Sequence, residues 1–156
     1  MLEKEFRVHT KWSAENKKEV SDVFLNSKTH KVYIENKSPL IVSAAKAFKG
    51  DASKYNPEDL LLSAVSSCHM MSYMYLCEKH SITLVNYSDQ TQGNLVVKAD
   101  GSGAFSEINI NPIVTILEED KLELAFNLHA EASRLCFIAN SCNVPMHYTP
   151  NIQIAN

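Results

Sequence analysis

The stretch "NPEDLLLSAVSSCHMMSYMYLCEKH", residues 56–80, decides the fold because it starts like a helix and then carries almost no charge. Asn56 suits an N-cap, Pro57 suits the first helical position, and two acidic residues follow in the first turn. Residues 60–77 are uncharged, but four serines and one histidine make them too polar for a lipid-facing helix. A helix that is apolar nearly all round is a buried one, so we expect a central core helix that ends near His80.

The composition is that of a soluble globular protein with a single domain, residues 1–156. Hydrophobic residues make up 45% of the chain and charged residues 21%, and a net charge of −3 argues against nucleic acid and anionic membranes as partners. The opening "MLEKEFRVHT" lacks the apolar region of a signal peptide, so we expect a cytoplasmic protein. In that reducing compartment the four cysteines are not expected to form permanent disulfides.

The order of the predicted elements indicates an α+β fold. An antiparallel meander is predicted from alternating residues at 5–12, 19–26 and 30–36, followed by a loop with a short apolar start at 38–55. After the central helix we expect two long strands within residues 82–111, joined at "ADGSG", then a second helix at 118–142 and a final strand at 145–155.

Two of the cysteines lie on apolar faces of the predicted helices. Cys68 sits in the middle of the first helix, and Cys136 lies near the end of the second, whose apolar residues keep helical spacing from Leu122 to Ala139. If the two helices pack on each other, the two sulfurs can meet. The alternative is that both are inert thiols, because free cysteine is often simply a small buried hydrophobe.

The segment "NPEDLLLSAVSSC" resembles the signature of the family that joins osmotically inducible protein C (OsmC) with organic hydroperoxide resistance protein (Ohr). In that family Asn-Pro-Glu opens the central helix and the reactive cysteine follows ten residues after the glutamate, as Cys68 follows Glu58. A second family cysteine ends the next long helix, where Cys136 stands. The resemblance implies a strongly curved antiparallel sheet around two central helices, in an intertwined homodimer.

The same resemblance implies a thiol-dependent peroxidase that reduces organic or fatty-acid hydroperoxides and holds no bound cofactor. Cys68 would attack the peroxide and become a sulfenic acid, and Cys136 would condense with it to a disulfide. An external dithiol would then reopen this disulfide, a lipoyl group being the reductant in the Ohr branch.

Activation of Cys68 is expected to need a cation, since burial in apolar surroundings disfavours a thiolate. In the family an arginine from the N-terminal region, held by the glutamate that matches Glu58, has this role. Ten helical residues place Glu58 about 15 Å from Cys68, so the carboxylate would have to serve the other subunit of a dimer. The alternative is that Glu58 is an ordinary acidic residue at a helix start.

The chain departs from the family pattern at two places. Its two arginines are Arg7 and Arg134, and Arg7 lies earlier than the family position. Either one of these reaches the site, or a lysine replaces the arginine, or activity is weak; the lysine candidates are Lys17, Lys18, Lys46 and Lys49. Cys136 also lacks the proline that follows it in many relatives, so we expect the second helix to run on by about a turn.

Other side chains support alternative interpretations. His69 follows Cys68 but points about 100° away around the helix, so we expect a core or interface histidine rather than a catalytic base. Cys77 with His80, and Cys142 with His147, could each supply half of a zinc site, but no known ligand spacing joins them, and no metal is expected. Three apolar residues are candidates for lining a pocket for an alkyl or acyl hydroperoxide, rather than packing alone: Met71, Tyr75 and Phe137.

Two functions from different classes therefore remain. The first is a hydroperoxide reductase that uses Cys68 and Cys136, with the peroxide, a dithiol and a second copy of the chain as partners. The second is a binding module of the same fold, which holds an apolar ligand and has vestigial cysteines. The missing N-terminal arginine favours the second, while the retained cysteine pair and Glu58 favour the first.

Overall fold

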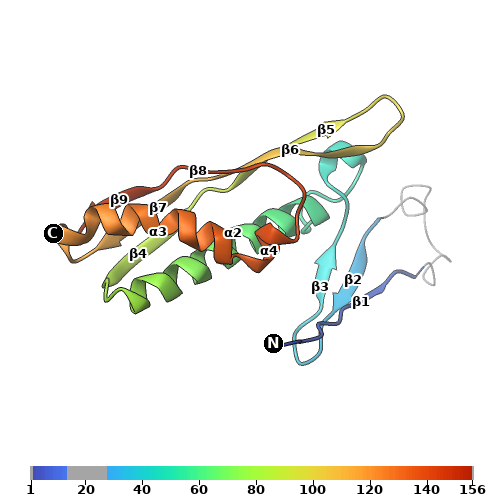
Figure 1. Ribbon diagram of the computed structural model, residues 1–156. Coiled ribbons are helices and arrows are strands. Elements are labelled where there is room, and N and C mark those ends of the chain that lie inside the picture. Colours follow the sequence, from blue (N-terminus) through green and yellow to red (C-terminus); the bar gives the residue numbers. More distant parts are fainter. Residues whose placement is uncertain (1, 14–27, 156) are drawn as a thin grey trace. The chain divides into compact units, whose positions relative to one another are not determined.

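The computed structural model describes residues 2–13 and 28–155. The chain divides into two compact units, Met1–Leu60 and Leu61–Asn156. Figure 1 shows the elements of both units in chain order. The strand predicted at residues 19–26 and the candidate cations Lys17 and Lys18 lie outside the described residues.

The first unit contains a three-stranded antiparallel sheet in the order β1-β2-β3. Its strands are β1 (His9–Lys11), β2 (His30–Tyr33) and β3 (Leu40–Val42). The predictions are confirmed for the later part of residues 5–12 and the first part of residues 30–36, but β3 lies in the segment predicted as a loop. Three apolar residues are too few to show an alternating pattern, and it is pairing with β2 that makes them a strand.

A tight connection follows β3 and includes the 3₁₀ helix η2 (Lys46–Phe48). The buried hydroxyl of Ser43 accepts a hydrogen bond from the backbone N–H of Asp51 at 3.1 Å. Gly50 lies so close to the carbonyl of Ala44 that a Cβ atom at this position would be 1.7 Å from that oxygen. The connection therefore depends on a residue without a side chain.

The central helix α2 (Pro57–Lys79) has the predicted bounds. The backbone N–H of Asp59 donates to Oδ1 of Asn56 at 2.8 Å, which confirms the predicted N-cap. The chain leaves the helix through Ser81, whose φ of 56° places it in the left-handed region, and the N–H of Ile82 donates back to the carbonyl of Cys77. Of the described residues, α2 is also the segment long and apolar enough to cross a membrane, a test that the core helix of a soluble protein passes as well.

Burial of α2 is one-sided within this chain. The buried residues share one side of the helix and are Val65, Cys68, His69, Tyr73, Leu76 and Cys77. Met71, Met74 and Tyr75 are exposed. The prediction of a helix buried all round is therefore wrong for the single chain.

The second unit holds two three-stranded sheets, with the orders β4-β7-β9 and β5-β6-β8. Their strands are β4 (Leu84–Asp89), β5 (Gln92–Val97), β6 (Gly103–Ile110), β7 (Pro112–Ile116), β8 (Met146–Tyr148) and β9 (Asn151–Ile154). β5 and β6 form the hairpin predicted at "ADGSG". β8 runs parallel to β6 and β9 parallel to β7, so the expectation of a purely antiparallel sheet is wrong.

Two of the three long strands predicted in this unit are split in two, the first into β4 and β5 and the last into β8 and β9, while β6 is the second and β7 follows it in residues without a predicted strand. Asp89 lies at the first break, where its carboxylate accepts hydrogen bonds from Ser66 on α2, from Thr91 and from the backbone N–H of Asn111. The final strand breaks at Thr149 and Pro150, where the chain leaves one sheet and enters the other. Proline removes a backbone donor and so ends a strand.

The second predicted helix is also interrupted. It comprises the 3₁₀ helix η3 (Glu119–Lys121), the helix α3 (Leu122–Leu135) and a short helix α4 (Phe137–Asn140). Cys136, between α3 and α4, has extended backbone angles of φ −72° and ψ 104°. The expectation that the helix runs on past Cys136 is therefore wrong, since the helix is interrupted there although no proline follows.

The core of the second unit lies between the helices α2 and α3 and the sheet β4-β7-β9 (Figure 1). Its buried residues come from all three parts and from the connection after α2: Tyr73, Leu76, Cys77, Ile82, Val114, Ile116, Ala125, Leu128 and Ala132. A smaller cluster joins Val65 of α2 to Ile108 and Ile110 of β6. The two clusters hold α2 along its length and fix the positions of the side chains described next.

Candidate functional site

Cys68 on α2 and Cys136 after α3 are brought together in the second unit. Cys136 is fully buried and Cys68 is 9% exposed, and both are free thiols. Burial, and then a hydrogen bond to Cys68, raise the pKa of the Cys136 thiol to about 11. The two sulfurs are therefore neighbours, with a protonated thiol at Cys136 at neutral pH.

The break between α3 and α4 is what presents Cys136 to α2. Because its backbone is extended, Cys136 serves as the N-cap of α4, and its Sγ accepts a hydrogen bond from the backbone N–H of Ala139 at 3.4 Å. This bond lowers the pKa of Cys136, but burial and Cys68 outweigh it. The thiol is thus held in place by the start of the short helix.

Tyr148 of β8 is a third member of this group. Burial raises the pKa of its hydroxyl, a hydrogen bond with Ser133 lowers it, and the nearby Cys136 and Cys68 raise it further. The tyrosine hydroxyl is therefore close to both thiols and stays protonated at neutral pH.

A pair of buried histidines joins α2 to α3 beside the two thiols. Nε2 of His69 and Nδ1 of His129 share a hydrogen bond of 3.0 Å, and both rings are almost fully buried. Burial lowers the pKa of His69 to about 4 and that of His129 to about 3, so both are neutral at pH 7. The ring of His69 packs on Tyr148 at 4.6 Å between centroids, and that of His129 stacks on Tyr73 at 3.9 Å.

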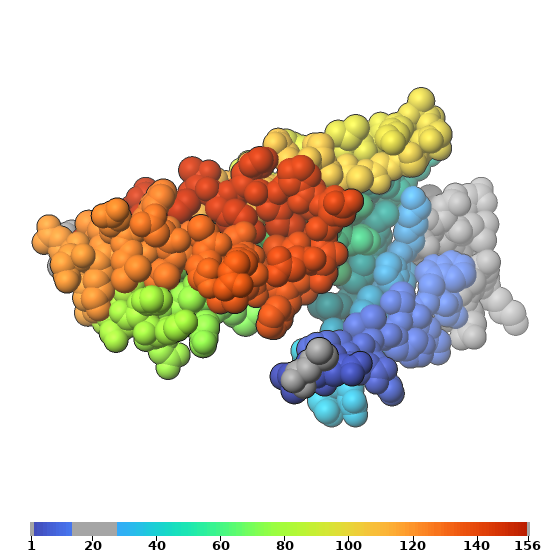
Figure 2. Space-filling model, in the orientation of Figure 1, coloured from blue at the N-terminus to red at the C-terminus, as the bar shows by residue number. Residues whose placement is uncertain are grey.

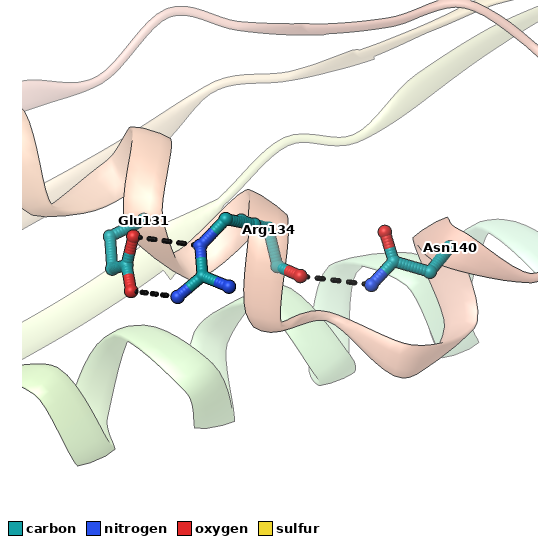
Figure 3. A network of polar contacts seen from close by, with 3 residues as sticks. All are labelled: Glu131, Arg134 and Asn140. Atoms are coloured by element: carbon teal, nitrogen blue, oxygen red, sulfur yellow. Dashed lines mark hydrogen bonds and ion pairs between the residues drawn. The ribbon is translucent and has the colours of Figure 1, made fainter.

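Both arginines of the chain make local ion pairs. Arg7 pairs with Glu5 at 2.7 Å, and both side chains are exposed. Arg134 pairs with Glu131 one turn earlier on α3, and Asn140 of α4 donates to the backbone carbonyl of Arg134 (Figure 3). Lys46 lies in η2, and Lys49 ends η2 with a left-handed φ of 61°.

Glu58 lies in the first turn of α2, as predicted. Its Oε2 atom is shielded from solvent and has no hydrogen-bond partner among the described residues. A shielded carboxylate oxygen without a partner is costly, and a cation or a hydrogen-bond donor would remove that cost.

The three residues expected to line a substrate pocket are all on the surface of this chain. Met71 and Tyr75 on α2 are each 57% exposed, and Phe137 at the start of α4 is 80% exposed. Figure 2 shows that α3, in orange, and the end of α2, in green, both reach the surface of the second unit on one face. Such large apolar side chains in the open indicate a surface that something else covers.

The described residues do not bring together the side chains of a zinc site. No group of three or more histidine, cysteine, aspartate or glutamate side chains in residues 2–13 and 28–155 could hold a metal ion. Cys77 is buried and lies against the hydroxyl of Tyr73, whereas His147 is exposed and 3.8 Å from Glu107.

Comparison with known proteins places the chain in a family. Residues 50–149, which include Glu58, Cys68 and Cys136, match the model of the OsmC-like protein family. The chain belongs to the OsmC-like family. No curated protein sequence matches it.

Solved structures of OsmC-like proteins have the same fold. An OsmC-like protein of unknown function from Vibrio cholerae is 21% identical, with a TM-score of 0.82 over 95% of this chain and 99% of that one. An organic hydroperoxide resistance protein OsmC from Legionella pneumophila is 12% identical, with a TM-score of 0.71 over 98% and 99% of the two chains. An organic hydroperoxide resistance protein from Elizabethkingia anophelis is 11% identical, with a TM-score of 0.68 over 99% and 100%. OsmC-like membership and the mixed α+β fold are thus established.

Sequence reasoning did not find two parts of this OsmC-like site. His129 lies seven residues before Cys136 on the apolar side of α3. A histidine among alanines and leucines on that side could have indicated a buried polar contact near the cysteine. Tyr148 had no such signal, because only the pairing of β8 with β6 brings it to the helices.

Proposed function

We propose that this OsmC-like protein is a thiol-dependent peroxidase that reduces organic hydroperoxides to alcohols in oxidative-stress defence. The observation that carries the proposal is the contact of the Cys68 and Cys136 thiols, both of which lie within the residues that match the OsmC-like family. Two cysteines from different helices that meet in a buried site can form a disulfide reversibly, which a purely structural thiol does not need.

In the proposed reaction the Cys68 thiolate attacks the distal oxygen of the hydroperoxide. The O–O bond breaks, the alkoxide takes up a proton and leaves as the alcohol, and Cys68 becomes a sulfenic acid. The Cys136 sulfur then attacks the Cys68 sulfur, a disulfide forms, and the hydroxyl group leaves as water after taking the Cys136 proton. An external dithiol, of which a lipoyl group is one candidate, reduces the disulfide and is itself oxidised.

Glu58 and a cation are proposed to activate the thiolate. Oε2 of Glu58 is shielded and lacks a partner among the described residues, as expected for a carboxylate that holds a cation supplied from elsewhere. Because ten helical residues separate Glu58 from Cys68, the proposed arrangement has Glu58 of one subunit serving Cys68 of the other in a homodimer. The candidates for the cation remain Arg7, Lys17, Lys18, Lys46 and Lys49.

The exposed side of α2 is proposed to serve two purposes in that dimer. Met71, Met74 and Tyr75 present an apolar strip that a second subunit would bury. The edge of the same strip, with Phe137, would receive the alkyl or acyl chain of the hydroperoxide, since methionine and aromatic side chains adapt to irregular apolar ligands. The proposed site is cytoplasmic, where a dithiol reductant is available.

A second function has its own supporting observation. Arg7 and Arg134, the two arginines of the chain, are each paired with a nearby glutamate on an exposed surface. If no other cation reaches Cys68, the thiol stays a poor nucleophile and the fold would serve as a binding module for an apolar ligand.

The deciding experiment treats the reduced protein with one equivalent of cumene hydroperoxide and follows intact mass and free thiols. The variants are Cys68→Ser and Cys136→Ser, with Cys142→Ser as the matched control for a cysteine outside the pair. We expect wild type and Cys142→Ser to lose two thiols and two hydrogens, Cys136→Ser to gain one oxygen, and Cys68→Ser not to react. If wild type keeps all its thiols over several minutes, the peroxidase proposal is wrong and the binding module is favoured.

A further inference from the structure

We propose that His69 and His129 are positioning residues for the cysteine pair, because their hydrogen bond sets the placement of α2 on α3 that brings Cys68 against Cys136. The inference deepens the proposed peroxidase function and rests on it for its biological meaning. It assigns a role to two residues that contact neither peroxide nor sulfur in the proposed chemistry.

The first support is the location of the bond. His69 follows Cys68 directly on α2, and His129 precedes Cys136 by seven residues, which is two turns of α3 or about 10 Å. Cys136 is the C-cap residue that ends α3, and both His129 and Cys136 contact residues of α2, namely His69 and Cys68. A bond of 3.0 Å between His69 and His129 therefore fixes both the rotation of α2 and its position along α3 next to the thiols.

The second support is that both rings are held on their outer faces. Tyr73 stacks on His129, and its own hydroxyl donates to the backbone carbonyl of Ala125 at 3.1 Å. Tyr148 packs on His69 and also lies beside both cysteines. Because the same tyrosine contacts the histidine pair and the thiol pair, a shift of one pair is transmitted to the other.

The third support is that burying the histidine pair between two helices has a free-energy cost. Each neutral imidazole has one N–H and one lone pair, so the shared bond leaves one donor and one acceptor over. Nδ1 of His69 and Nε2 of His129 are buried and have no partner among the described residues. Two apolar side chains of similar size would avoid that cost, so stability alone does not explain the pair.

The test measures how readily the disulfide forms in the full chain, without any peroxide. Reduced protein is equilibrated with glutathione buffers, in which glutathione disulfide oxidises Cys68 and Cys136 to the disulfide and yields two glutathione thiols. The fraction of Cys68–Cys136 disulfide is determined by alkylation and peptide mass mapping. This equilibrium constant reports how well the two sulfurs are placed relative to each other.

The informative variant is the double replacement His69→Leu with His129→Leu, which removes both polar groups and keeps the volume. We expect it to fold with a free energy of unfolding at least equal to that of wild type, while the equilibrium constant for the disulfide falls at least tenfold. A tenfold fall raises the reduction potential by about 30 mV. The two single variants His69→Gln and His129→Asn each place an amide nitrogen where Nε2 or Nδ1 was, and this nitrogen can donate to the remaining histidine. Each single variant should keep the equilibrium constant for the disulfide within threefold of wild type.

Several outcomes would overturn the inference. One is a double leucine variant that folds and keeps the wild-type constant, and another is a wild-type protein that forms no Cys68–Cys136 disulfide in the glutathione buffers. If the double variant does not fold, His129→Asn and His129→Leu are compared instead, and equal constants overturn the inference. If wild type forms the disulfide in the glutathione buffers but does not react with cumene hydroperoxide, the peroxidase proposal is refuted and the positioning role stands.

Discussion

At the scale of single residues, burial in the second unit keeps titratable groups neutral. His69 and His129 have pKa values of about 4 and 3, while the pKa of Cys136 is raised to about 11. In each case removal from water disfavours the charged form. The nearby carboxylate of Asp89 partly offsets this effect at His69, but burial is larger.

This neutrality predicts how stability depends on pH. Below the ordinary histidine pKa of 6.5 the unfolded chain binds two protons that the folded chain does not bind until about pH 4 and 3. The contribution of the two neutral histidines to the free energy of unfolding is therefore present above pH 6.5. It is lost as the pH falls toward 4, at about 2.7 kcal/mol per pH unit for two protons. When the free energy of unfolding is measured in urea between pH 7 and 4.5, its slope against pH should be smaller by that amount in the double variant His69→Leu with His129→Leu. An equal slope in wild type and the double variant would contradict the prediction.

Gly50 provides a second prediction at this scale. In Gly50→Ala the new Cβ would lie 1.7 Å from the carbonyl oxygen of Ala44, so backbone must move. We expect the free energy of unfolding of the protein to fall by more than about 1 kcal/mol. Gly101→Ala is the matched control, since its φ of 84° costs about 1 kcal/mol but a Cβ there meets open space. Urea denaturation checks the difference, and equal losses would show that the Gly50 connection can relax.

At the scale of secondary-structure elements, the break between α3 and α4 has the largest effect on the site. Phe137 is the first residue of α4 and is exposed, which is the position in a helix that accepts proline. We expect Phe137→Pro to change the free energy of unfolding by less than about 1 kcal/mol in either direction. Ala139→Pro should cost about 2 kcal/mol or more, because it removes the donor to the Cys136 sulfur. Thermal unfolding of both variants measures the contrast, and a large loss for Phe137→Pro would mean that α4 is not a separate helix start.

The elements that local signals define were predicted correctly from the sequence. Helix α2 has both a capping residue and a long uncharged run, and the β5-β6 hairpin has a glycine-containing turn. The breaks at Asp89 and Cys136 could not be predicted, because each depends on hydrogen bonds made in the folded chain. The parallel pairing of β8 and β9 is likewise a matter of topology, which a strand pattern does not specify.

The candidate site was predictable in part for the same reason. Cys68 and Cys136 lie on apolar helix faces that the 3.6-residue period reveals, and the structure brings them together. The partner of His69 was not predictable, because a histidine on an apolar face gives no indication of what lies opposite. The roles of Glu58 and of the cation stay predictions, since they depend on a second subunit.

At the scale of the whole molecule, the exposed side of α2 predicts a dimer. Light scattering should give a mass near twice the 17.5 kDa of one chain, because Met71, Met74 and Tyr75 would otherwise face water. Met71→Glu with Met74→Glu should convert the dimer to a monomer, whereas Val85→Glu, an exposed position on β4, should not. A wild-type monomer at micromolar concentration would contradict both the dimer and the proposed role of Glu58.

The topology of the second unit also governs when it can fold during synthesis. Both of its sheets take their last strand from residues 146–154, more than thirty positions after the strands that receive them. A nascent chain that has reached Leu135 already contains both helices and the first two strands of each sheet, yet neither sheet has its third strand. Cys136 and Tyr148 are also missing at that stage, so Cys68 and the two histidines are synthesised before the thiol and the ring that lie against them. We therefore expect Cys68 to stay accessible to oxidants until the last strands are added, which makes those strands the closing step of folding.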